Sequence, residues 1–215
     1  MKKILSIVAA VLFAGSMLAA EFVKTPFASI KSTDVVIITA SKGDKVYAMS
    51  TEKSAQNNPA AQEIAVVSDK ITTDADTLQW NVVIGEDKDS CIIYPAGDDT
   101  QWLYCNKSSN AIRLGTGAAR GFQVKQVESS GENYDYLYNK TFTSYVGVSN
   151  SSDWRHYATI GSAIKEENLA FFVKTSATSI DNNAVQTKAV KMIENGRLVI
   201  IKNGVKYDAL GAIIQ

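Results

Sequence analysis

The 215-residue sequence contains one histidine, two cysteines and three prolines. A single histidine excludes zinc sites built from several histidines and the paired histidines of metalloprotease helices. There is no P-loop and no dinucleotide-binding glycine pattern. Lysine and arginine number 22, as do aspartate and glutamate, so the net positive charge typical of nucleic-acid-binding proteins is missing. We therefore expect no metal centre, no cofactor and no nucleic-acid partner.

Long apolar runs are missing after residue 20. Before it, Lys2 and Lys3 precede the apolar run 4–18 and the small pair Ala19-Ala20. This pattern is typical of a signal peptide, and the run is too short for a membrane-spanning helix. The sequence thus predicts a signal peptide over 1–20 and a secreted or cell-surface protein whose mature chain has no transmembrane segment.

What the sequence does contain is a repeat. Residues 91–124 hold four short apolar runs separated by Gly, Asp, Asn and Ser, and the same order occurs once before and once after them. The first runs of the three copies are 35–38, 91–94 and 134–137, the second 46–50, 102–106 and 145–149, the third 64–69, 111–116 and 154–159, and the fourth 80–82, 122–124 and 171–173. Short alternating runs bounded by turn residues predict β-strands.

Three units of four strands are each too small to bury a face alone. The closed three-fold solution is the β-trefoil, a barrel that leaves no exposed edges. We expect an all-β, β-trefoil-like domain over 32–175, with 51–63 as a surface-loop insertion and 21–31 as a loosely held leader. A two-sheet sandwich is the alternative.

The C-terminal part has a different pattern. Residues 176–187 are polar and predict a linker, whereas 188–215 contain two Asn-Gly turn signals and predict a small β-meander. The tail E-N-G-x-L-x-I-x-x-N-G-x-x-Y-x-x-x-G, residues 194–211, resembles the C-terminal tails of exported Bacteroidetes proteins, many of which resemble type IX sorting signals. It differs from them in ending on Gln215 rather than on a basic residue.

The central domain carries a second resemblance. Its motifs are Trp102-Leu103-Tyr104-Cys105, Tyr136-Leu137-Tyr138-Asn139, Tyr145-Val146-Gly147-Val148 and Asp153-Trp154-Arg155. With these it resembles an uncharacterised module of secreted gut Bacteroidetes proteins. The resemblance implies an exported context but no particular activity.

Aromatic residues on the second and third strands of the later copies are the candidate binding residues. Sugar rings stack on exposed aromatic faces, and Asp, Asn and Arg complete the hydrogen bonds. The candidates are Trp102, Tyr104, Tyr145, Asp153, Trp154 and Arg155. Core packing is the alternative, and it is expected for Trp80, Phe122 and Phe171. We expect a non-catalytic glycan-binding module; the alternatives are an adhesion or inhibitor module with a host or cell-surface protein partner, and, more remotely, a glycoside hydrolase.

No residue is assigned to catalysis. His156 falls on a predicted strand, where a histidine is hydrogen-bonded or faces solvent. The carboxylate pairs Asp74/Asp76, Asp87/Asp89 and Asp98/Asp99 lie in predicted turns, which favour Asp for local backbone bonding. A glycosidase would need such a pair in one pocket.

The two cysteines lie symmetrically about Asp98, the centre of a predicted turn. In a hairpin of that register Cys91 and Cys105 would face each other across the strands. The sequence leaves two outcomes open, a disulfide or two buried thiols.

Overall fold

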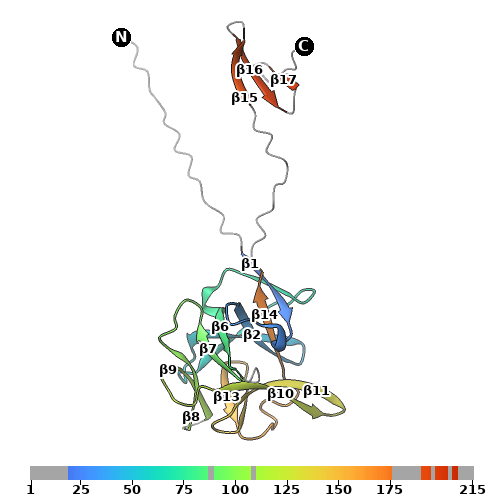
Figure 1. Cartoon of the computed structure of the whole chain (residues 1–215). Helices are drawn as coiled ribbons and strands as arrows, with labels where there is room; N and C mark the ends of the chain where they lie inside the picture. Colours follow the sequence, from blue (N-terminus) through green and yellow to red (C-terminus); the bar gives the residue numbers. More distant parts are fainter. Residues whose placement is uncertain are drawn as a thin grey trace, which may run out of the picture. The chain divides into compact units, whose positions relative to one another are not determined.

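The computed structural model describes residues 19–86, 90–107, 110–175, 190–194, 197–202 and 205–207. The chain divides into two units, Met1–Thr175 and Ser176–Gln215 (Figure 1). The described residues form β-strands and two short 3-10 turns, so the all-β prediction is confirmed. Among these residues, no helix has the length and apolar character needed to cross a membrane.

The first unit contains a fourteen-stranded antiparallel sheet. Its strands are β1 (Ala20–Thr25), β2 (Val35–Lys42), β3 (Lys45–Lys53), β4 (Pro59–Glu63), β5 (Lys70–Thr73), β6 (Trp80–Ile84), β7 (Cys91–Pro95), β8 (Trp102–Asn106), β9 (Ala111–Gly115), β10 (Phe122–Ser129), β11 (Glu132–Asn139), β12 (Ser144–Ser149), β13 (Asp153–Tyr157) and β14 (Asn168–Lys174), with 3-10 turns at Phe27–Ser29 and Asp76–Leu78.

The first and fourth strands of the predicted copies pair in one continuous order. Successive antiparallel ladders join β14 to β2, β2 to β6, β6 to β7, β7 to β10 and β10 to β11. Between β11 and β14 the Asp135 N–H donates to Asn168 Oδ1 at 2.9 Å. The six strands thus follow one another by pairing, and the last contacts the first.

The second and third strands form three hairpins, β3–β4, β8–β9 and β12–β13. The hairpins meet through β13, where Asp153 pairs with Ala60 of β4 and Arg155 pairs with Ala111 of β9. The strands bury alternate residues because successive side chains point to opposite faces. Trp80, Phe122 and Phe171 are 0, 0 and 3% exposed and belong to the main core, as expected.

The first copy differs from its prediction. Its third strand is Pro59–Glu63, within the expected surface insertion 51–63, and Asn58 and Pro59 are buried. The expected strand 64–69 makes only one isolated bridge, at Val67. Ile64 and Val66 pack instead against a second, smaller core cluster. The alternating apolar residues Ile64 and Val66 therefore pack on a core although they belong to no β-strand.

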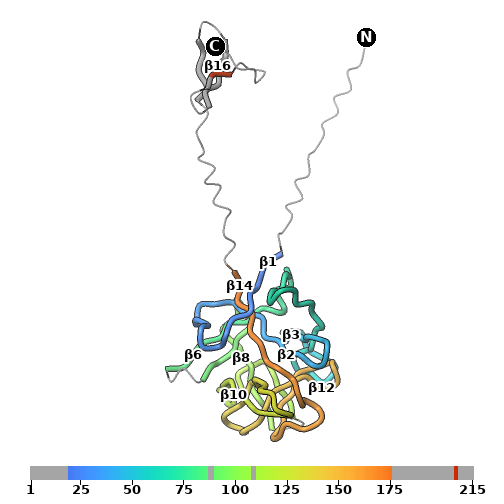
Figure 2. Tube along the Cα trace, turned by 90° about the vertical axis from the view of Figure 1, so that its right-hand side faces the viewer, coloured from blue at the N-terminus to red at the C-terminus, as the bar shows by residue number. Residues whose placement is uncertain are grey.

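Residues 21–31 are also not the loose leader that was expected. β1 pairs with both β14 and β5. β1 and β14 lie side by side (Figures 1 and 2). Phe22 is fully buried, among Ile37, Ile71 and Phe172. The first unit therefore begins before the predicted boundary at residue 32, because one aromatic side chain in the leader completes the second core cluster.

The second unit contains three antiparallel strands, β15 (Val190–Glu194), β16 (Arg197–Lys202) and β17 (Val205–Tyr207), in that order. This is the strand order of the predicted meander. The predicted linker 176–187 and the two Asn-Gly turns lie outside the described residues.

Candidate functional site

The β8–β9 hairpin carries two aromatic side chains on its outer face. Trp102 lies opposite Gly115, and Tyr104 lies opposite Arg113. Leu103 between them points to the other face and is fully buried. Since Trp102 and Tyr104 are only half-buried, these two predicted ligand-binding residues share one partly exposed surface.

The same face continues into β13 and β12. Arg155 of β13 lies opposite Ala111 of β9, and Tyr145 of β12 lies opposite Tyr157 of β13. Directly opposite residues project from the same side of a sheet. By register, Arg155 and Tyr145 therefore lie on the face that carries Tyr104.

Three contacts hold the Trp102 ring in place. Its Nε1–H donates to the Gly117 carbonyl oxygen at 2.6 Å. The guanidinium carbon of Arg120 lies 4.4 Å from the ring centroid, over the ring. Tyr94 makes an edge contact, with 6.4 Å between the ring centroids. The indole is thus fixed on a hairpin rather than on a free loop.

Tyr104 rests on the backbone of the segment after β9. A Cβ atom built on Gly117 would lie 2.1 Å from the Tyr104 ring, which no real contact allows. Glycine is required there because the ring occupies the space of a side chain. One face of Tyr104 is consequently packed, and its orientation is set before any ligand arrives.

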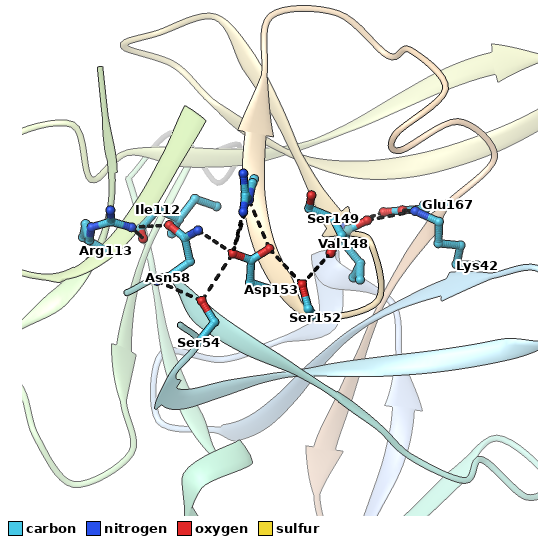
Figure 3. Close-up of polar contacts among 11 residues, drawn as sticks. Lys42, Ser54, Asn58, Ile112, Arg113, Val148, Ser149, Ser152, Asp153 and Glu167 are labelled. Atoms are coloured by element: carbon cyan, nitrogen blue, oxygen red, sulfur yellow. Dashed lines mark hydrogen bonds and ion pairs between the residues drawn. The ribbon is translucent and has the colours of Figure 1, made fainter. Parts of the chain in front are cut away.

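A polar cluster links the β8–β9 hairpin to β13. We name it the Asp153 cluster, and it consists of Ser54, Asn58, Arg113, Asp153 and Arg155 (Figure 3). Asn58 Nδ2 donates to Asp153 Oδ2 at 2.6 Å, and Ser54 Oγ lies 3.3 Å from the same oxygen. Arg155 donates to the Asp153 carboxylate from Nε at 3.1 Å and from Nη2 at 3.2 Å. Arg113, which lies opposite Tyr104, donates to Asn58 Oδ1. Asn58 thus connects Arg113 to the buried carboxylate of Asp153.

Within this cluster the charge of Asp153 is balanced by Arg155. Asp153 is 0% exposed, while 26% of the Arg155 side chain is exposed. Hydrogen bonds from Arg155 to Asp153 raise the pKa of the guanidinium above its usual value. A buried carboxylate needs such compensation, and the hydrogen bonds to Asp153 in turn hold the Arg155 guanidinium in place.

Trp154 does not belong to the exposed face, contrary to expectation. It is 0% exposed and part of the main core, with its Nε1–H directed at the Ala48 carbonyl oxygen at 3.5 Å. Its neighbours Asp153 and Arg155 project from the other side of β13. Alternation therefore places Trp154 inward once Arg155 faces outward.

Tyr145 lies among other tyrosines. Its ring makes edge contacts with Tyr136 and Tyr138, at centroid distances of 5.9 and 5.0 Å. Lys125 Nζ lies 3.5 Å from the Tyr138 ring centroid. Tyr145 is thus on the shared face by register, while its ring contacts come from β11 rather than from Trp102 or Tyr104.

His156 is a buried, hydrogen-bonded strand residue. It is 6% exposed, with Nδ1 2.9 Å from Ser144 Oγ and Nε2 3.0 Å from the Asn106 carbonyl oxygen. Its ring stacks on Phe142 at 5.7 Å. Both ring nitrogens are engaged, and alternation along β13 directs Asp153 to the opposite face.

Cys91 and Cys105 are free, buried thiols and form no disulfide with each other. β7 pairs with β6 and β10, and β8 pairs with β9. The β7–β8 hairpin register that would place the two cysteines opposite each other is therefore not formed. Burial raises the pKa of Cys91 to about 12 and also raises the pKa of Cys105.

The described carboxylate pairs, Asp74/Asp76 and Asp98/Asp99, lie between strands. Asp98 accepts from Thr100 and Gln101, which lowers its pKa, and Asp76 accepts from Gln79. Asp87 and Asp89 lie outside the described residues. Asp98 and Asp99 also line a cleft of about 520 Å³, together with Asn81 and Tyr94. Because Tyr94 contacts Trp102, the cleft adjoins the aromatic face.

Sequence reasoning missed Arg113, Arg120 and Asn58. One sequence signal for the arginines exists: no Asp or Glu occurs between Thr100 and Val127. Asn58 has no such signal, because its role arises only when β4 meets β13.

The assembled face combines half-buried aromatic rings with guanidinium donors. It can stack on planar or apolar ligand surfaces and donate hydrogen bonds to oxygen acceptors. Comparison of the chain with models of known protein families and with curated proteins finds no match to either.

Proposed function

We propose that the chain is an exported, non-catalytic binding module that binds glycans through the outer face of the β8–β9 hairpin. The observation that supports this most is the pair Trp102 and Tyr104, half-buried on one face and fixed by contacts to Gly117. Rings that are already oriented lose little conformational freedom on binding. Such rings are suited to stacking on the apolar faces of sugar rings.

The adjoining cleft supports a ligand longer than one sugar. Asn81, Asp98 and Asp99 supply hydrogen-bonding groups there, and Tyr94 lies between this cleft and Trp102. Carboxylate and amide side chains in an aromatic-lined cleft can bind sugar hydroxyls.

For the fold we propose a β-trefoil, with β2, β6, β7, β10, β11 and β14 as the barrel and the three hairpins as its cap. The pairing order of these strands and the Asp135–Asn168 contact support it over a two-sheet sandwich. Backbone NOEs between β11 and β14 would test the closure of the barrel, and their absence would favour the sandwich.

An adhesion or inhibitor module that binds a host or cell-surface protein is the second candidate. Tyr104 lies opposite Arg113, Arg120 lies over Trp102, and Arg155 shares their face by register. Trp, Tyr and Arg are the residues most enriched in protein-interface hot spots.

A glycan array probed with the mature protein, followed by titration calorimetry on any hit, tests the first candidate. Trp102→Ala and Tyr104→Ala should each weaken binding by about tenfold or more, since stacked aromatic contacts contribute about 1 kcal/mol beyond their buried area. Tyr207→Ala, in the second unit, is the control and should bind normally. Absence of binding to every glycan, with capture of a host protein that Trp102→Ala abolishes, would replace the first candidate by the second.

We also propose that 1–20 is a signal peptide and that 188–215 is a sorting tail of the Bacteroidetes type. The pattern of residues 194–211 supports this, as does the division of the chain at Ser176. Deletion of 176–215 should alter surface display or release into the medium. The melting temperature of the remaining unit should shift by only about a few degrees, because little buried area is lost. Unchanged localisation would remove the sorting proposal.

A further inference from the structure

The segment that carries the aromatic face has an unusual charge distribution. From Thr100 to Val127 the chain contains Lys107, Arg113, Arg120 and Lys125 but no acidic residue, although the whole chain is balanced. The β8–β9 hairpin lies entirely within this segment. The β8–β9 part of the proposed site is therefore locally positive, whereas the adjoining cleft carries Asp98 and Asp99.

Two guanidinium groups on this face have no carboxylate partner among the residues that the structure describes. The ion pairs among the described residues include neither Arg113 nor Arg120. Arg113 donates from Nη1 to two neutral acceptors, Asn58 Oδ1 and the Ile112 carbonyl oxygen. The carboxylate of Asp153 forms its ion pair with Arg155, so it does not neutralise Arg113.

Arg120 also changes what Trp102 can bind. The guanidinium lies 4.4 Å from the ring centroid, so one ring face is covered by a cation and is closed to a sugar ring. Among the described residues, none accepts a hydrogen bond from the Arg120 guanidinium, so its donors stay available. On this covered face a neutral sugar would gain little, whereas an anionic group would gain charge-assisted hydrogen bonds from the guanidinium.

We propose that the ligand is an acidic glycan, bearing carboxylate or sulfate groups, whose anion is bound by Arg120 and Arg113 while a sugar ring stacks on Tyr104. This inference rests on the glycan-binding function proposed above. Arg113 is held in place by Asn58, and Arg120 by the Trp102 ring. Both donors are therefore positioned before the ligand binds, which favours bidentate recognition of planar or tetrahedral oxyanions.

The experiment uses matched pairs of probes with the full mature chain. Polygalacturonate is compared with its carboxyl-reduced form, heparin with desulfated heparin, and a sialylated glycan with its desialylated form. The acidic member of at least one pair should bind about tenfold or more tightly, and the pair that responds distinguishes carboxylate from sulfate. Its binding should weaken as ionic strength rises from about 0.05 to about 0.5 M.

Variants show whether the arginines are responsible. Arg120→Gln should weaken binding of the acidic probe by about tenfold and leave its neutral partner unaffected, and Arg120→Lys should restore part of the loss. Lys70→Gln removes the same charge from β5, where Lys70 pairs with Glu21, and should have no effect. Circular dichroism and melting curves confirm that each variant is folded.

The outcomes separate this inference from the function it rests on. Equal binding of acidic and neutral partners, with Arg120→Gln silent but Trp102→Ala damaging, would overturn the acidic ligand and keep the glycan-binding function. No binding to any of the probes or to the array would overturn both. Tighter binding to a single-stranded oligonucleotide than to every acidic glycan would show that the face recognises nucleic acid instead.

Discussion

Asn58 Nδ2 donates a hydrogen bond of 2.6 Å to Asp153 Oδ2, and the two residues are 95 positions apart in the chain. Both side chains are buried, and Asn58 also accepts from Arg113 through Oδ1. One amide therefore connects all three hairpins, since it precedes β4 and contacts residues of β9 and β13.

Replacing this amide should destabilise the first unit. We expect Asn58→Ala to lower the free energy of unfolding by about 2 kcal/mol, because a buried carboxylate and a guanidinium each lose a partner. Urea denaturation at neutral pH measures the change. Gln56→Ala, an exposed position in the same connection, is the control and should stay within about 0.5 kcal/mol of the wild type. Equal stability of the two variants would show that the cluster adds nothing to the fold.

Gly147 is enclosed by the connection between β13 and β14. A Cβ atom there would lie 2.5 Å from both Glu167 Oε2 and Ile164 Cγ2. Gly147→Ala should therefore destabilise the protein by about 1–3 kcal/mol, as overpacking does. Gly121→Ala is a matched control, because nothing lies within 4 Å of a Cβ at that position. Thermal unfolding of the two variants side by side gives the comparison, and similar melting temperatures would contradict the tight packing of Ile164 on β12.

Glu167 should make stability depend on pH. It is 1% exposed, with Lys42 Nζ at 2.8 Å and the Val148 N–H donating at 2.8 Å (Figure 3). Burial raises the pKa of this carboxyl, and this effect outweighs Lys42, which lowers the pKa. The Glu167 carboxyl thus keeps its proton to a higher pH in the folded state than in the unfolded chain. The stability that this protonation contributes is present below the pKa of the unfolded chain, about 4.3, and is lost as pH rises through the raised pKa of the folded state.

Glu167→Gln removes this titration. The difference in unfolding free energy, wild type minus variant, should decrease as the pH is raised from about 4 to about 7. Urea denaturation across that range provides the values. A difference that grows with pH would mean that the ion pair with Lys42 dominates and that the carboxyl is ionised at little cost.

The thiols should be unreactive in the folded protein. Cys91 is 1% and Cys105 2% exposed, and burial raises both pKa values, which leaves almost no nucleophilic thiolate at pH 8. Ellman's reagent should detect no thiol in the native protein and two after unfolding in guanidinium without reductant, matching the two cysteines of the sequence. Detection of none after unfolding would indicate a disulfide.

Most strands were predictable because period-two alternation is a local signal. The run from Trp102 to Asn106 and the run from Asp153 to Tyr157 both form strands near their predicted bounds. Alternation shows that Trp154 and Arg155 point to opposite faces, but not which of the two faces is buried. That choice depends on β4 and β9 meeting β13, which lies beyond the reach of a local pattern.

The elements that were missed depend on distant partners. Asn58 lies in a stretch rich in Gln, Asn and Ala whose composition is typical of an exposed loop, yet it binds a carboxylate 95 residues away. Phe22 is the one buried aromatic of a short N-terminal strand, and its environment comes from β2, β5 and β14. Arg120 follows β9 without any strand pattern, and only its position over the Trp102 ring gives it a role.

The antiparallel ladder between β1 and β14 has a mechanical consequence. Thr175 N–H donates to the Glu21 carbonyl oxygen at 2.9 Å, and Phe22 pairs with Lys174, so the start of β1 and the end of β14 are adjacent. A pulling force applied across residues 20 and 175 would open this ladder from its end, one hydrogen bond at a time, because the bonds lie perpendicular to the strands. The unit should therefore yield at low force when held by both ends, and it would withstand tension from a bound ligand far better when tethered from one end alone.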